Sequence, residues 1–155
     1  MAKKTKAEIV FMPRTKMNQK FSGNHQGIVA EVIEYEYKEL ADVIKKCKDK
    51  NAVIAMLDGL EDPHNLGAIL RSVDAFSYDA VILPKNRSCN ITEVVAHVST
   101  GAIEHVKIAY VNSLNTIVLR LKDKGYWICG TDAKGDTVQP FNVNEENRVS
   151  ICIAE

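Results

Sequence analysis

Net charge is absent from this chain, because 20 lysines and arginines stand against 20 aspartates and glutamates. A protein that holds nucleic acid by bulk attraction needs an excess of clustered cations, and this balance argues against that class of binder. Basic residues do gather locally within residues 1–20, where they include Arg14. We interpret this stretch either as a solvated, frayed end or as an RNA-contacting arm.

Closely spaced metal ligands and disulfide partners are also lacking. The 4 cysteines lie far apart without a C-x-x-C spacing, and no histidine stands three or four residues from another histidine or a cysteine. These spacings argue against a disulfide framework and predict that the chain holds no metal. The sequence shows no charged start followed by an apolar leader, and its composition is that of an ordinary globular chain. We therefore expect a cytoplasmic protein that does not bind membranes.

From residue 51 onward, short β-branched runs alternate with helical patterns. Strands are predicted at 52–58, 79–84, 105–111, 126–133 and 148–154. Helices are predicted from the apolar stripe Leu66, Ile69, Leu70, Val73 and Phe76, and at 91–102 and 113–125. This alternation is typical of a parallel sheet with crossover helices, so the predicted fold is a doubly wound α/β domain with a mostly parallel sheet.

The first part of the chain does not share that alternation. Residues 8–12 could form a strand, and the polar run 15–27 suggests a linker. Residues 25–35 have the alternating character of a further strand, and residues 39–50 predict a short amphipathic helix.

The turn after the strand at 52–58 combines features that favour a ligand site. Open α/β sheets bind ligands outside the carboxyl ends of their strands. Asn65 can cap the next helix, Gly67 lacks a Cβ and lets another group approach closely, and Arg71 lies on the same face as Gly67. This arrangement aims a guanidinium at the space over the strand end. The alternative is that Arg71 pairs with Asp74 and Gly67 serves packing alone.

These residues carry a resemblance to a known family. The stretch DGLEDPHNLGAILRSVDAF resembles the first motif of the SpoU (TrmH) family of RNA ribose 2′-O-methyltransferases, of the SPOUT class. Its pattern, Asn-x-Gly-x-x-x-Arg after a strand, is matched by Asn65, Gly67 and Arg71. The likeness begins at HQGIVAEV and continues through DAVILPKNRS, TGAIEHV and WICGTDAKG. It implies a SPOUT-type, trefoil-knot fold, S-adenosylmethionine as methyl donor, RNA as acceptor and a homodimer.

The resemblance also implies roles for individual residues. Arg71 would activate the ribose 2′-hydroxyl; because a guanidinium rarely gives up its proton, orienting the hydroxyl and stabilising the developing alkoxide is physically easier. Asn65 would hold the loop and the Arg71 side chain, and Glu155 matches a glutamate of a later motif. We therefore expect Arg71, Asn65 and Glu155 to be the catalytic residues.

Cofactor and RNA contacts follow from the same resemblance. The strand end GTDAKG lies where the family contacts S-adenosylmethionine, which assigns Thr131 and Ala133 to cofactor binding. A polar turn after a strand is the alternative reading of this segment. For RNA binding we expect His25, Arg14 and Arg71 to contribute.

The chain departs from the family near its end. Family members continue with Gly-x-Glu-Gly and Ser-Leu-Asn segments that form the knot, whereas this chain reads Ile153, Ala154, Glu155. We expect residues 25–155 to be a methyltransferase domain truncated before the knot, with weak cofactor binding. Residues 1–24 would be the end of an N-terminal RNA substrate-binding domain and its linker.

The leading functional hypothesis is methylation of a ribose 2′-hydroxyl, with a guanosine of 23S ribosomal RNA preferred to transfer RNA as the substrate. The alternative is a SPOUT-like module that binds RNA or a partner without chemistry. A phosphoacceptor domain using Asp58 is disfavoured, because this sequence does not place the acidic pair and the lysine that such a domain needs. A dinucleotide-binding enzyme is disfavoured because no G-x-G-x-x-G follows a predicted strand.

Overall fold

The computed structural model describes residues 8–31, 35–46, 52–131 and 148–154. The chain forms two compact units, Met1–Glu34 and Tyr35–Glu155. The domain division expected from the sequence, at residues 24 and 25, stays a prediction.

Among residues 8–31, the N-terminal unit holds one helix, α1 (Arg14–Lys20), which has no buried residue. Residues 8–12 are not a strand, and the run expected to be a linker is partly helical. The strand predicted at 25–35 is also wrong, because none of its described residues lies in a strand. The physical reason is a turn: Gln26 and Gly27 have φ values of 50° and 90°, a left-handed conformation that extended backbone cannot contain.

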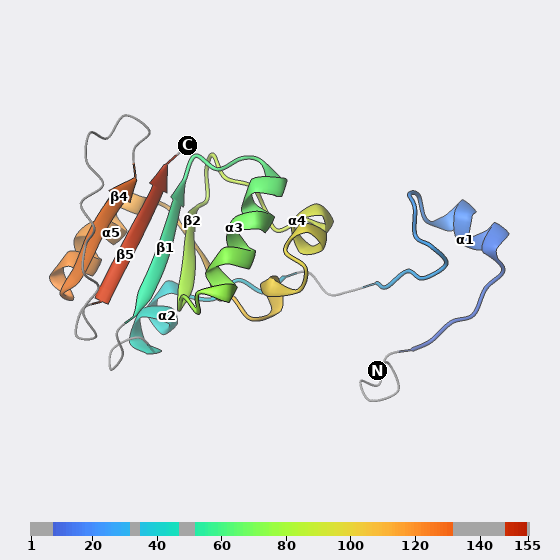
Figure 1. The fold of residues 1–155 in the computed structure, drawn as a ribbon, viewed down its shortest axis with the longest axis horizontal. Coiled ribbons are helices and arrows are strands. Elements are labelled where there is room, and N and C mark those ends of the chain that lie inside the picture. Colours follow the sequence, from blue (N-terminus) through green and yellow to red (C-terminus); the bar gives the residue numbers. More distant parts are fainter. Residues whose placement is uncertain (1–7, 32–34, 47–51, 132–147, 155) are drawn as a thin grey trace. The chain divides into compact units, whose positions relative to one another are not determined.

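The C-terminal unit is built on one sheet, shown in Figure 1. Its strands are β1 (Val53–Asp58), β2 (Ala80–Pro84), β3 (Ile108–Val111), β4 (Tyr126–Thr131) and β5 (Arg148–Ala154). They follow the order β3-β2-β1-β5-β4, and every pairing is parallel. The predicted doubly wound α/β fold is therefore confirmed.

The helices of this unit are α2 (Leu40–Lys46), α3 (Pro63–Ala75), α4 (Glu93–Val98) and α5 (Leu114–Asp123), with a 3-10 turn, η2 (Ala102–Glu104). The helix predicted at 91–102 is shorter than expected. Thr92, rather than Asn90, caps its start, and its end is followed by left-handed backbone at Thr100. Because η2 occupies the following residues, β3 starts later than the strand predicted at 105–111.

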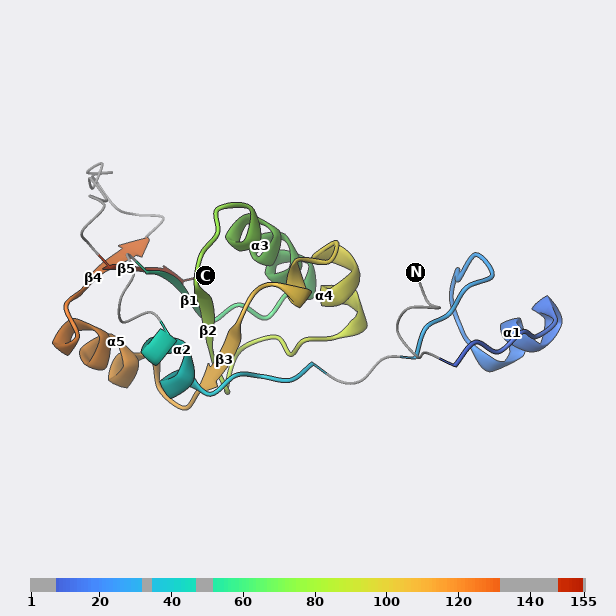
Figure 2. The same ribbon diagram turned by 90° about the horizontal axis from the view of Figure 1, so that it is seen from below.

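The sheet is covered on both faces, as Figure 2 shows, with α3 and α4 on one side and α2 and α5 on the other. The central strand serves both layers through the alternation of its side chains: Ile54 and Met56 enter the α2/α5 core, whereas Ala55 and Leu57 enter the α3/α4 core. Each fully buried aliphatic side chain contributes about 1.5–3 kcal/mol to the free energy of folding, relative to leaving it exposed. In the described parts of the chain, no helix is long and apolar enough to span a membrane.

Candidate functional site

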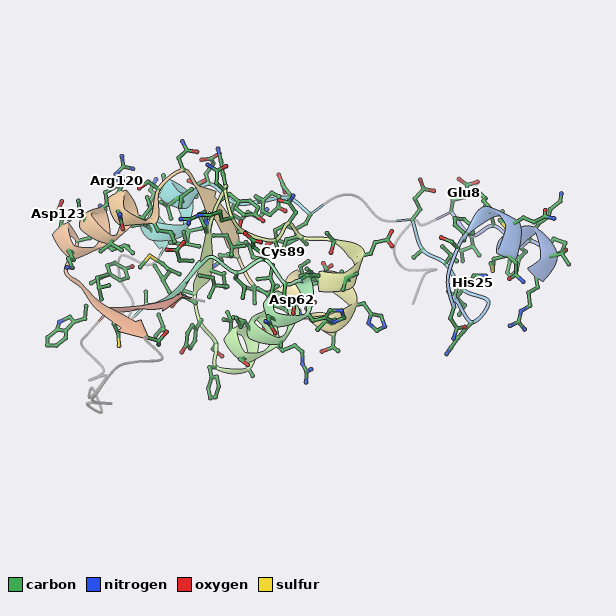
Figure 3. The ribbon with its side chains drawn as sticks, turned by 90° about the horizontal axis from the view of Figure 1, so that it is seen from above. Glu8, His25, Asp62, Cys89, Arg120 and Asp123 are labelled. Atoms are coloured by element: carbon green, nitrogen blue, oxygen red, sulfur yellow. The ribbon has the colours of Figure 1, made fainter. Side chains whose placement is uncertain are left out.

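The start of α3 is set by Asp62 and Pro63. Asp62 has extended backbone, its carboxylate Oδ1 accepts a hydrogen bond from His64 N at 2.9 Å, and Pro63 occupies the first helical position. Figure 3 shows Asp62 at this end of the helix. The prediction that Asn65 is the cap is therefore wrong, because proline favours an extended residue before it and the helix starts earlier. Asn65 lies exposed in the first turn.

Gly67 marks the place where α3 meets α4. A methyl group at this position would stand 2.7 Å from Cβ and Cγ1 of Val98 and 3.2 Å from the Ser99 nitrogen. Real Cβ atoms do not approach so closely, so only glycine admits the end of α4 here. The group that approaches Gly67 closely is thus the end of α4.

The chain reverses sharply just after α4. Ser99 is fully buried, and its hydroxyl donates to Ala96 O at 2.9 Å. Thr100 and Gly101 follow with φ values of 50° and 95°. A left-handed conformation costs a non-glycine residue about 1–2 kcal/mol. The packing around Ser99 supports this conformation and fixes residues 99–102 beside α3.

An open groove of about 550 Å³ lies along this contact and is lined by Arg71, Asp74, Phe76 and Thr100, among others. Small residues of α3 and η2 form the rest of its wall. Arg71 is exposed, and its guanidinium forms no hydrogen bond or ion pair within the described ranges. The alternative of pairing with Asp74 is therefore not observed. We call this feature the α3/α4 groove.

A second hollow, of about 300 Å³, lies at the carboxyl ends of β1, β2 and β3 and includes Asp58, Pro84, Arg87 and Asn112. Arg71 does not line this strand-end cavity, contrary to the aim expected from the sequence. The reason is that α3 runs back along the sheet, and the rise from Pro63 to Arg71 is about 12 Å. Sequence reasoning expected a ligand site at the end of β1 but did not identify the residues after β2 and β3 that line the cavity, although the polar residues that follow each strand were a signal for them.

The remaining predicted residues belong to different units or lie outside the described residues. Thr131 is exposed at the end of β4, in register with Ile153 of β5. Ala133 and Glu155 lie outside the described residues. In the N-terminal unit, Arg14 is exposed at the start of α1.

His25, labelled in Figure 3, also belongs to the N-terminal unit. Its Nε2 lies 3.0 Å from Asn18 Oδ1, and its Nδ1 accepts from Gly27 N at 3.1 Å. Both ring nitrogens therefore have partners inside this unit. In the described parts of the chain, no three His, Cys, Asp or Glu residues gather as a metal site.

Sequence reasoning also missed a cluster of three tyrosines beside the edge strand β3. The ring centroids of Tyr35 and Tyr37 lie 5.2 Å apart, and those of Tyr37 and Tyr110 lie 4.5 Å apart. The Tyr35 hydroxyl donates to Val106 O at 2.9 Å, and the Tyr110 hydroxyl donates to Cys89 O at 2.6 Å. Burial raises the pKa of Tyr35 and that of Tyr110 above the ordinary value.

This cluster positions the loop after β2 next to the loop after β1. Cys89 N donates to Leu60 O at 2.8 Å, and Figure 3 shows Cys89 near the start of α3. Burial, followed by the nearby Asp62 carboxylate, raises the pKa of the Cys89 thiol. This thiol is therefore a weak nucleophile at neutral pH.

Comparison with known proteins places these features in a family. Residues 52–153 match the model of the SpoU rRNA methylase family, and residues 1–38 match the model described as RNA 2′-O ribose methyltransferase substrate binding. The putative TrmH family tRNA/rRNA methyltransferase YacO of Bacillus subtilis is 45% identical over 135 residues, which cover 86% of this chain and 54% of that protein. A Staphylococcus aureus (strain COL) protein with the same family description is 44% identical over 138 residues, covering 88% and 56%. The chain thus spans about half the length of these relatives.

Solved structures agree at the level of fold. An rRNA methyltransferase from Sinorhizobium meliloti, solved with AdoMet bound, has a TM-score of 0.60 and 20% identity, covering 76% of this chain and 43% of that one. The TrmH/SpoU tRNA modifying enzyme of A. aeolicus has a TM-score of 0.57 and 19% identity, covering 75% and 61%.

Proposed function

Because this chain belongs to the SpoU rRNA methylase family, we propose that it methylates the 2′-hydroxyl of an RNA ribose with S-adenosylmethionine as the donor. The observation that supports this most is Arg71, an exposed guanidinium without a partner in the described ranges, at the wall of an open groove. A cation on a solvated face usually serves solubility, but here it occupies the arginine position of the Asn-x-Gly-x-x-x-Arg pattern.

Arg71 is proposed to act on the acceptor hydroxyl. Its planar fork of N–H donors can hold the ribose oxygen and a neighbouring phosphate together, and it remains charged throughout. As the hydroxyl passes its proton to the neighbouring RNA phosphate or to water, the same donors stabilise the developing alkoxide. Asn65, exposed in the first turn of α3, would hold the preceding loop, and Glu155 stays a predicted catalytic residue outside the described range.

We propose that S-adenosylmethionine binds at the carboxyl edge of β4 and β5. Thr131 is exposed there, and the end of β5 lies between the ends of β4 and β1. When bound, the cofactor supplies a methyl group activated by a sulfonium. We propose Thr131 and Ala133 as its contacts.

For the substrate we propose a guanosine of 23S ribosomal RNA before a transfer RNA. The rRNA methylase description of the matching family supports this order, although the relatives are described for both RNA classes. Residues 1–24 are proposed as the end of an RNA substrate-binding domain and linker, with Arg14 and His25 as contacts, and residues 25–155 as the methyltransferase domain. The match of residues 1–38 to a substrate-binding model supports this assignment. We propose that the intact protein is a homodimer.

The experiment is transfer of a labelled methyl group from S-adenosylmethionine to ribosomal and transfer RNA fragments. Arg71→Ala is expected to lower turnover about 100-fold or more, as loss of a transition-state donor does, while Arg71→Lys retains part of it. Arg120→Ala, an exposed arginine on α5, is the matched control and should retain full turnover.

Unchanged turnover in Arg71→Ala would remove Arg71 from the mechanism. Filter binding separates the alternative function: RNA retained on the filter by the unmodified chain, with no methyl incorporated, would identify a binding module without chemistry. Circular dichroism of each variant ensures that lost turnover is not lost folding.

A further inference from the structure

An aromatic ring stands exposed at the end of α3. Phe76, the C-cap of this helix, has 76% of its surface exposed. Its backbone is nevertheless fixed, since its N–H donates to Ser72 O at 2.9 Å and Ser77 N donates to Asp74 O at 3.0 Å. The backbone that carries the ring is therefore fixed, while the ring itself is not packed.

The surroundings of Phe76 are those of the α3/α4 groove. The groove is lined by this ring, by the Arg71 guanidinium and by the Asp74 carboxylate, and Ala75 gives it a small-residue wall. Its volume of about 550 Å³ is large enough for a small ligand of nucleotide size. One cation and one anion at the rim leave little net charge, so a ligand gains its affinity here by stacking more than by bulk attraction.

These properties match an unpaired nucleobase. Sequence-specific RNA recognition uses bases splayed out of the helix and stacked on aromatic rings or guanidinium planes, and each stacked base contributes to the free energy of binding. We propose that Phe76 is a stacking platform for an unpaired base of the substrate RNA, next to the nucleotide whose ribose Arg71 contacts. This inference rests on the proposed RNA substrate, but it assigns binding, and not chemistry, to Phe76.

The test uses intrinsic fluorescence. Trp127, on the edge strand β4, is the single tryptophan of the chain, so Trp127→Phe removes the native signal and adding Phe76→Trp places one indole in the groove. Titration with a single-stranded RNA oligonucleotide, without S-adenosylmethionine, is expected to give saturable quenching. Loss of the ring in Phe76→Ala should weaken RNA binding about tenfold, whereas Phe76→Tyr retains it.

Controls separate stacking from other roles. Trp127→Ala removes another exposed aromatic side chain and should leave RNA affinity unchanged. The thermal midpoint of Phe76→Ala should equal that of the unmodified chain because the ring is not packed. The logarithm of affinity should fall only gently with the logarithm of salt concentration, with a slope of about −0.7 for each phosphate contacted.

Three outcomes would overturn the proposal. They are RNA affinity unchanged in Phe76→Ala, an indole signal that RNA does not quench, and an indole signal that depends on protein concentration without RNA, which would show that a second copy covers the ring. Because the titration contains no methyl donor, quenching can succeed when methyl transfer fails. Conversely, failure of quenching leaves the Arg71 experiment intact.

Discussion

Helices cover both faces of the sheet over a buried core, but the surface grooves of the two faces are built differently. Each described face carries a cluster of buried side chains drawn from two helices and from alternate positions of β1 and β2. The α2/α5 face has a groove of about 480 Å³ whose rim consists partly of the long side chains Lys45 and Arg120 on regular helices. The α3/α4 groove is instead lined partly by Thr100, whose backbone is left-handed, and it lies next to the helix contact at Gly67.

The difference teaches that burial does not locate the site. Both faces contribute to stability in the same way, through apolar side chains removed from water. The candidate site lies where α4 stops short and the chain turns back, because this arrangement leaves Arg71 and Phe76 beside a wall of fixed backbone. Strained backbone held by its surroundings is common at functional sites.

The largest expected effect on stability comes from substitutions that create a cavity in the core of each face. Leu70 and Leu121 are each fully buried, one on each face. Leu70→Ala and Leu121→Ala should each lower the free energy of unfolding by about 2–5 kcal/mol, from lost burial and the cavity left behind. Urea denaturation measures both. A loss in one variant that is smaller by more than about 2 kcal/mol would show that the faces are not equivalent in stability.

The helix contact at Gly67 is the next test. Gly67→Ala forces a methyl group against Val98 at a cost of about 1–3 kcal/mol, offset by about 1 kcal/mol of improved helix propensity. We expect a net loss of stability by urea denaturation. Val98→Ala should recover part of the loss, because it removes Cγ1 but leaves Cβ.

The adjacent exposed alanine supplies the control for this cycle. Ala68→Gly should cost about 1 kcal/mol through propensity alone and show no coupling to Val98→Ala. If Gly67→Ala stabilises the protein, the two helices can separate freely and the groove wall is not fixed by this contact.

The tyrosine cluster at the edge of the α3/α4 face is expected to add a pH dependence. Tyr110→Phe removes the hydroxyl that donates to Cys89 O at 2.6 Å and should cost about 1 kcal/mol at neutral pH. Burial raises the pKa of Tyr110 above its ordinary value of 10.0. As the pH rises above that value, the unfolded state loses its proton first, so stability that is complete below pH 10 declines towards the folded pKa.

The measurement is the free energy of unfolding at about pH 8 and about pH 10.5. The decline between the two should be smaller in Tyr110→Phe than in the unmodified chain, with Tyr78→Phe, outside the cluster, as control. An equal decline in both would show that the hydroxyl is not buried in solution.

The smallest effect is expected from relieving the turn itself. Thr100→Gly keeps the left-handed conformation but removes its steric cost of about 1–2 kcal/mol. Glycine adds an entropic cost of about 0.5–1 kcal/mol on folding. The net gain in stability should be about 0.5 kcal/mol, with weaker RNA binding because the groove wall loosens. RNA affinity equal to that of the unmodified chain would mean that the turn is structural alone.

Sequence periodicity located most of the sheet because its strands are short apolar runs between turns. It failed where the φ angles of one or two residues determine whether a strand or helix can form. A left-handed pair at Gln26 and Gly27 excludes the predicted strand, and Thr100 shortens α4. Neither is visible in an apolar pattern. The position of β5 between β1 and β4 was also beyond prediction, because it depends on pairing between distant segments.

The candidate site was predicted in part. The pattern of Asn65, Gly67 and Arg71 located the helix and the family, but Asp62 forms the cap because it precedes proline. The direction of Arg71 depends on how α3 packs against α4, and spacing along one helix does not determine that. Phe76 was counted as part of the apolar stripe, whereas the helix ends there and leaves the ring outside.

The strand order has a consequence for synthesis on the ribosome. β5 pairs with β1 along the whole length of β1, from Val53 with Val149 to Asp58 with Ala154, and it also joins β4 to the sheet. Until residues 148–154 have been translated, β1 presents an open apolar edge to the surrounding solution. The nascent protein must wait for this late segment before its sheet can close, and during that delay it is exposed to mispairing with other chains.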